Sequence, residues 1–79
     1  MKKTVRSISE IAQDITKDWT KVYFGAVPYL QAMRSLNNVS DSYGQDSARG
    51  IISYFLSNAT TWRGETARNV KKELNTMLK

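Results

Sequence analysis

The sequence predicts an all-α fold, a compact bundle of four helices with the third helix at its centre. Apolar residues recur at steps of three and four along four segments, the spacing of a buried stripe on a helix and not the alternation of a strand. The chain has only 79 residues, so these stripes must be buried against one another. We therefore expect one domain over residues 1–79, with helices near residues 7–20, 27–37, 45–58 and 62–77.

The first helix is predicted to begin after Ser7. The hydroxyl of Ser7 can accept from the backbone N–H of Glu10 while the Glu10 carboxylate reaches back, which is the capping-box arrangement. The apolar stripe that follows is Ile8, Ile11, Ala12, Ile15, Trp19 and Val22. This helix should end at Trp19 or a little beyond.

The second helix is predicted to be short. Gly25 should permit a backbone turn ahead of it, and Pro28 suits the first turn of a helix, where the missing N–H costs nothing. Its apolar positions are Tyr29, Leu30, Met33 and Leu36. The segment Val39–Gln45, VSDSYGQ, is rich in turn-forming residues and is expected to be a loop, and no strand is predicted anywhere.

The third helix is the predicted hub of the core because it carries the most apolar stripe. That stripe is Ala48, Ile51, Ile52, Phe55, Leu56 and Ala59. Gly50 lies inside the helix, and the close approach of another helix backbone would explain a glycine there. Thr60 or Thr61 should cap the fourth helix, whose apolar positions include Ala67, Val70 and Leu74.

The composition excludes several classes of enzyme and metal site. The chain has no cysteine and no histidine, which excludes Cys/His zinc sites, Ser-His and Cys-His nucleophile pairs and imidazole bases. Among the carboxylates, Asp14 and Asp18 are one turn apart, but on the predicted exposed face of a helix and not in a cleft. We expect no catalytic residue, no metal and no cofactor.

The net charge of +5 is concentrated at the two ends of the chain. Lys2, Lys3 and Arg6 make the start basic, and residues 63–79 carry five basic residues against two acidic ones. If the ends lie side by side, they form one basic face that attracts phosphate backbones. The alternative is that the surplus of basic residues serves only solubility.

No stretch of the sequence suits a membrane. The basic start is followed by an amphipathic segment with Glu10, Asp14 and Asp18, which is unlike a signal peptide. No run approaches the roughly 18 apolar residues that a membrane span needs. A cytoplasmic protein is therefore expected.

The candidate binding residues lie in the last third of the chain, and they are Trp62, Arg63, Arg68, Lys71 and Lys72. Tryptophan and arginine are enriched in interface hot spots, so Trp62 and Arg63 are read as an exposed patch that binds a partner. Alternatively, Trp62 covers the core. The basic residues of the fourth helix are read either as a recognition surface for DNA or as a solvated face. Lys71 and Lys72 are both expected to be exposed.

Aromatic residues elsewhere in the chain invite a second nucleic-acid interpretation, because aromatic rings interleaved with basic residues can stack on bases. These residues are Tyr23, Phe24, Tyr29, Tyr43 and Tyr54. They are distant in sequence from the basic ends, and several fall on predicted core stripes. Base stacking is therefore the less favoured interpretation.

Three segments carry a family resemblance, together with the opening ISEIAQDI. They are YFGAVPYLQAM (residues 23–33), DSYGQDSARGIISYFLSNATTWRGETAR (residues 41–68) and NVKKEL (residues 69–74). With them the chain resembles small, uncharacterised helical proteins encoded by phages and prophages of Gram-positive bacteria. The resemblance implies a gene product that acts in the bacterial cytoplasm, where such proteins often bind host or phage proteins or nucleic acid. It assigns no functional residue.

The sequence thus predicts a non-enzymatic phage or prophage accessory protein. Its leading function is a protein-interaction module for an unidentified phage or host protein, as a monomer or weak homodimer. The alternative is a nucleic-acid-binding protein that uses the basic N-terminus and the basic C-terminal helix. A third possibility is a structural or self-associating protein, which would need an apolar patch left exposed after the monomer folds.

Overall fold

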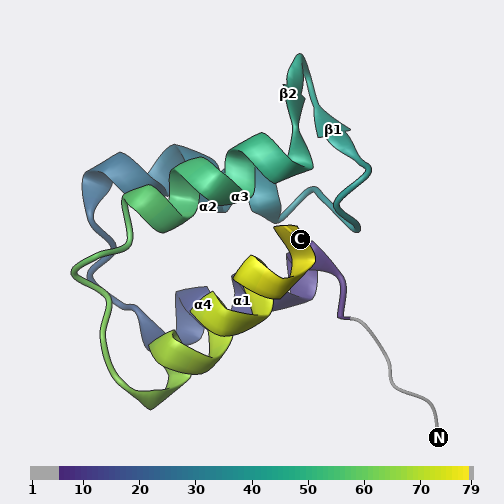
Figure 1. The fold of residues 1–79 in the computed structure, drawn as a ribbon. Coiled ribbons are helices and arrows are strands. Elements are labelled where there is room, and N and C mark those ends of the chain that lie inside the picture. The colour runs from purple at the N-terminus through teal and green to yellow at the C-terminus, as the bar shows by residue number, and fades with distance from the viewer. Residues whose placement is uncertain (1–5, 79) are drawn as a thin grey trace, which may run out of the picture.

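Four α-helices are arranged in two layers in the computed structural model, which describes residues 6–78 (Figure 1). One layer contains α2 (Val27–Met33) and α3 (Ala48–Ser57), and the other contains α1 (Ile8–Asp18) and α4 (Glu65–Leu78). A single turn of 3-10 helix, η1 (Phe24–Ala26), leads into α2. A small antiparallel hairpin of β1 (Ser42–Tyr43) and β2 (Asp46–Ser47) projects beside α3. The prediction of a mostly helical fold is confirmed, and the prediction of no strand is wrong.

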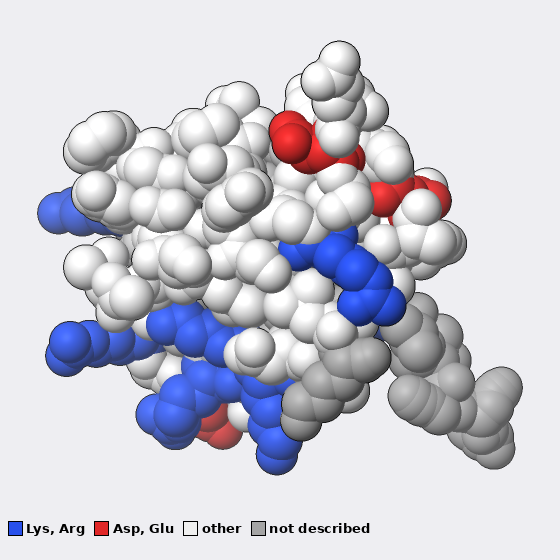
Figure 2. Space-filling model, turned by 45° about the horizontal axis from the view of Figure 1, so that its top comes forward, with Lys and Arg blue, Asp and Glu red and all other residues white. Residues whose placement is uncertain are grey.

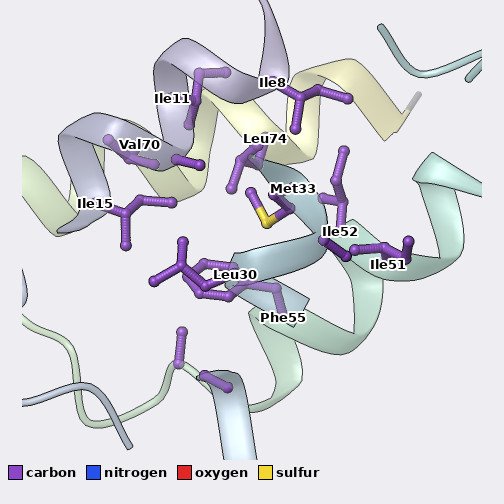
Figure 3. Close-up of a cluster of buried hydrophobic side chains, with 14 of the residues drawn as sticks. Ile8, Ile11, Ile15, Leu30, Met33, Ile51, Ile52, Phe55, Val70 and Leu74 are labelled. Carbon is purple, nitrogen blue, oxygen red and sulfur yellow. The ribbon is translucent and has the colours of Figure 1, made fainter. Parts of the chain in front are cut away.

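The core lies between the two layers and takes side chains from all four helices (Figure 3). Its largest fully buried side chains are Phe55, Ile8, Ile11, Ile15, Met33, Leu36, Ile52 and Leu74. The Cα radius of gyration is 11.7 Å, close to the value of about 11.6 Å expected for a compact domain of this length. Because α1 buries as many side chains as α3, the central place of α3 stays a prediction.

The start of α1 is held by its own cap and by the end of α2. The capping box between Ser7 and Glu10 is confirmed, since each side chain accepts from the other residue's backbone N–H. The first N–H groups of the helix, which have no partner within it, donate outward. Ile8 donates to the Asn37 carbonyl and Ser9 to the Leu36 carbonyl, both at 2.9 Å.

These bonds explain why α2 is shorter than predicted. The predicted helix runs to residue 37, but α2 ends at Met33. Residues 36 and 37 must leave the helix to present their carbonyls to α1. The departing chain is then held by Asp41, whose Oδ2 accepts from the backbone N–H groups of Asn37 at 2.9 Å and Asn38 at 3.1 Å. These two hydrogen bonds lower the pKa of Asp41.

The hairpin delays the start of α3. Ser42 pairs with Ser47 and Tyr43 with Asp46, which leaves Gly44 as the first central residue of a two-residue turn. Its φ of 65° suits the glycine position of a type II′ turn. The predicted start of this helix at residue 45 or 46 is therefore wrong, because those residues belong to the turn and to β2. Ser47 caps α3 by accepting from the Gly50 N–H.

Two glycines have reasons other than those predicted. A Cβ on Gly50 would lie 3.3 Å from the Ser47 hydroxyl, so this glycine adjoins the helix cap and not another helix. Gly25 does not adopt a positive φ, the conformation that only Gly44 and Gly64 adopt among the described residues. A Cβ on Gly25 would lie 2.5 Å from the Tyr23 ring and 2.8 Å from Oδ1 of Asn58. Gly25 therefore lets the chain before α2 approach the end of α3 closely.

The fourth helix begins three residues later than predicted. It starts at Glu65, after Gly64 with a φ of 114°, and not at residue 62. Thr60 and Thr61 lie in the turn before it, so the predicted cap by either threonine is wrong. Similarly, α1 ends at Asp18 because Trp19 leaves helical geometry, with φ −97° and ψ 86°. Trp19 and Trp62 therefore both lie outside the helices, and both are buried in the core.

Replacing Phe55 with alanine tests the importance of α3. Phe55 is fully buried, and the cavity left by its ring should lower the free energy of unfolding by about 3–5 kcal/mol. Urea denaturation would measure the loss, with Ser53→Ala on the exposed side of the same helix as the control. A loss under about 1 kcal/mol would show that α3 is not the hub of the core.

The lowered pKa of Asp41 predicts a loss of stability in acid. Its ordinary pKa is 3.8, so its contribution to stability is present above that pH and disappears as the pH falls through the lower pKa of the folded state. Wild type should therefore be more stable than Asp41→Asn at neutral pH, and the difference should shrink in acid. Denaturation curves over a pH series measure it. Asp46→Asn makes the same charge change in β2, and an equal pH dependence in both variants would contradict the assignment.

Candidate functional site

Trp62 is part of the core and is not the exposed anchor that the sequence suggests. Its side chain is only 2% exposed and stacks on Trp19, with ring centroids 5.7 Å apart and planes 11° apart. The indole N–H donates to Oδ2 of Asp18 at 2.8 Å. Trp19 in turn meets Phe55 edge to face at 6.2 Å. The prediction that Trp62 lies in an exposed patch is wrong, because a core this small uses both indoles, and the interpretation of Trp62 as a cover of the core is confirmed.

Lys71 is also more enclosed than the sequence suggests. Its Nζ donates to the Trp62 carbonyl at 2.7 Å and lies 6.0 Å from the centre of the Trp62 ring, a cation–π distance. Burial lowers the pKa of Lys71, and the positive charge of Arg63 lowers it further. The expectation that Lys71 is exposed is therefore wrong, since its side chain crosses the turn before α4 and is only partly exposed.

The exposed face of α4 is polar and mostly basic. Arg68 and Lys72 are exposed and lie one turn apart on the helix, and Arg63 is exposed just ahead of it. Helical spacing places three further exposed residues beside them, namely Asn69, Asn75 and Thr76. Figure 2 shows Lys and Arg side chains gathered over the part of the surface that α4 occupies. The sequence interpretation missed the two asparagines and the threonine, which the spacing from Arg68 would have revealed.

The nearby carboxylates are engaged away from this face. Glu73 accepts from Arg6 at 2.7 and 3.1 Å, and Asp14 pairs with the same guanidinium. Hydrogen bonds, first from Glu73 and then from Asp14, raise the pKa of Arg6 and keep it charged. Within residues 6–78, the ion pairs that form are these two, so Arg63, Arg68 and Lys72 have no carboxylate partner there. Glu65 is the acidic residue on the exposed face, in the first turn, where a negative charge stabilises the helix.

The structure only partly supports one basic face built from both ends of the chain. Arg6 does reach α4, but the two carboxylates neutralise it. Lys2, Lys3 and Lys79 lie outside the described residues. A different residue, Arg49 of α3, comes to the end of α4 and donates from Nη1 to the Leu78 carbonyl at 2.8 Å. A cation at this position also stabilises the C-terminus of the helix.

The depression between α1 and α4 offers no acid–base pair. It is open and lined by Asp14, Lys17, Asp18 and Thr66. Asp14 is paired with Arg6, and Asp18 accepts from the Trp62 indole. Among the described residues, no three carboxylates gather in a way that could hold a metal ion. Both carboxylates are thus held in contacts with other residues of the fold, and neither is placed as a free acid or base.

The exposed aromatic residues are not next to α4. Tyr23, Phe24 and Tyr54 are well exposed, and they belong to α3 and to the chain that leads into α2. The layer of α2 and α3 lies on the other side of the core from α4 (Figure 1). The fold therefore does not place these rings where they could stack on the bases of a nucleic acid whose phosphate backbone contacts α4.

The two neighbouring lysines of α4 should respond differently to the same substitution. Lys71→Gln removes a charge-assisted hydrogen bond and the contact with Trp62, and should lower the melting temperature by about 5 °C. Lys72→Gln, the matched control, should leave it within about 1 °C because Lys72 is exposed. Thermal unfolding followed by circular dichroism measures both. Equal melting temperatures for the two variants would contradict the structural role of Lys71.

Across residues 6–78, the helices are all too short or too polar to cross a membrane. Comparison with known proteins gives no further guide: no protein-family model matches the chain, and no curated protein or solved structure matches it. The function must therefore be argued from the described residues.

Proposed function

We propose that this chain is a non-enzymatic nucleic-acid-binding protein that holds the phosphate backbone with the exposed face of α4. The observation that carries the proposal is the set of exposed cations, Arg63, Arg68 and Lys72, without a carboxylate partner among the described residues. Lysine and arginine side chains of this kind neutralise the phosphates of a nucleic-acid backbone and release its counterions.

The chemistry of the face favours nucleic acid over a protein partner. Protein interfaces are centred on buried aromatic or apolar anchors with a polar rim. With Trp62 in the core, the exposed side of α4 has no large apolar side chain to serve as that centre. Arginine, lysine, asparagine and threonine are instead the side chains that contact phosphates and sugars in protein–DNA complexes.

The shape of α4 suits the same ligand. Its 14 residues span about 21 Å, which is long enough to follow a groove or a stretch of backbone. Arg63 and Lys71 are close enough for the charge of one to lower the pKa of the other.

A protein partner is the second candidate function, as the sequence predicts. The charged residues Arg63, Arg68 and Lys72 would then bind an acidic surface of a phage or host protein. For both candidate functions we keep the predictions that the protein originates in a phage or prophage and that it acts in the bacterial cytoplasm.

Titration with a short mixed-sequence DNA duplex, followed by amide chemical shifts, tests the proposal. We expect shifts clustered on residues 63–76 at low salt, and a steep loss of affinity as salt rises. Arg68→Gln with Lys72→Gln should weaken binding and reduce the salt slope by about 2, since each lost phosphate contact removes about 0.9. Lys21→Gln with Arg34→Gln removes the same charge elsewhere and serves as the control.

Two outcomes would contradict the proposal. If no amide shifts appear at low salt, where even non-specific binding is expected, α4 does not bind nucleic acid and the protein partner takes its place. If the control pair weakens binding as much as the α4 pair, the interaction reflects net charge alone and not this helix.

A further inference from the structure

Most of the layer formed by α2 and α3 carries no charged side chain. Residues 22–33 and 50–62 contain no Lys, Arg, Asp or Glu, although 24% of the chain is charged. These two runs supply all of α2 and the part of α3 from Gly50 onward, and the two helices pack side by side. The charged residue of α3, Arg49, lies in its first turn and donates to the Leu78 carbonyl of α4. Figure 2 shows the surface over this layer as mostly white, in contrast to the basic surface over α4.

Four aromatic side chains make this surface unusual, and we refer to them as the aromatic face: Tyr23, Phe24, Tyr29 and Tyr54. The side chain of Phe24 is 79% exposed, that of Tyr54 is 54% exposed and that of Tyr23 is 43% exposed. The rings form two pairs, Tyr23 with Phe24 at 4.9 Å and Tyr29 with Tyr54 at 5.4 Å between centroids. A phenylalanine this exposed contributes little to the core of its own chain.

The two pairs belong to one continuous surface. Gly25 lies against the Tyr23 ring and against the Asn58 side chain, where a Cβ would be 2.5 and 2.8 Å away. The amide of Asn58 donates to the Tyr54 carbonyl at 2.9 Å. The segment that contains Tyr23 and Phe24 is thereby held against the end of α3, the helix that carries Tyr54.

We propose that the aromatic face is the interface of a weak homodimer, and that its occupant is a second copy of this chain. The charge distribution supports this choice. Two copies that each carry a charge of +5 repel one another, and least where neither presents a charged side chain. The aromatic face meets that condition, whereas the exposed side of α4 does not.

The area of the face indicates how tight the dimer is. An aromatic side chain has about 200 Å² of surface, so Tyr23, Phe24 and Tyr54 together expose about 350 Å². Two copies would bury about 700 Å² of aromatic surface, which by itself is less than the lower limit of about 1,200 Å² for a stable interface. The dimer therefore depends on concentration.

The geometry leaves α4 free in the dimer. Because the layer of α1 and α4 lies across the core from the aromatic face, pairing through α2 and α3 directs both α4 helices outward (Figure 1). A two-fold dimer would then present two copies of the α4 face. Self-association does not depend on that face, so Arg68→Gln with Lys72→Gln should maintain or strengthen it by lowering the charge of each copy, even if α4 binds no nucleic acid.

Analytical ultracentrifugation of the full chain tests the proposal. The average mass should rise from 9.0 kDa toward twice that value between about 10 µM and about 1 mM. Raising the salt should maintain or strengthen association because it screens like-charge repulsion, whereas phosphate binding by α4 should weaken. Phe24→Ser with Tyr54→Ser should weaken association at least about tenfold.

The hairpin supplies a matched control. Tyr43 is 49% exposed but lies in β1, outside the aromatic face, so Tyr43→Ser should not change association. Concentration-dependent amide shifts of the wild type should map to residues 22–33 and 50–58, which locates the interface without any variant. A constant mass of 9.0 kDa at every concentration overturns the proposal. So does association that Phe24→Ser with Tyr54→Ser leaves intact.

Discussion

The stack of Trp62 on Trp19 is the contact on which the arrangement of the helices depends. Each indole comes from a residue just outside a helix, so the contact joins the end of α1 to the turn before α4. Through Phe55 it also reaches α3. The hydrogen bond from Trp62 to Asp18 satisfies the one polar group that the indole would otherwise bury. Small domains are often stabilised by disulfides, and because this chain has no cysteine, the packing of these rings links the segments instead.

The other end of the two-layer structure is held by backbone groups. The N-terminus of α1 donates to carbonyls that follow α2, and Arg49 of α3 donates to the C-terminal carbonyl of Leu78 in α4. Helix ends carry unsatisfied N–H and C=O groups, and here carbonyls that follow α2 satisfy the start of α1 while the Arg49 side chain satisfies the end of α4. The bonds from α1 explain why α2 stops at Met33.

The resulting separation of charge gives the two layers different chemistry. Asp14 and Glu73 are engaged by Arg6 and Asp18 by Trp62, which leaves Glu65 as the acidic residue beside the exposed cations of α4. The layer of α2 and α3 combines an uncharged surface with exposed rings. One surface therefore suits anions and the other suits an uncharged, aromatic-rich partner surface, and the two proposals use different sides of the molecule.

The sequence by itself determined the helical class, the approximate place of each helix and the Ser7–Glu10 cap, because local spacing and capping depend on residues within one turn of each other. It also identified the basic stripe of α4 by the same periodicity. Only the tertiary structure decided that Trp62 is buried, that Lys71 is bound to the Trp62 carbonyl and that α2 ends at Met33. Each of these depends on a contact with a distant part of the chain, such as Trp19 or the start of α1, which no local pattern contains.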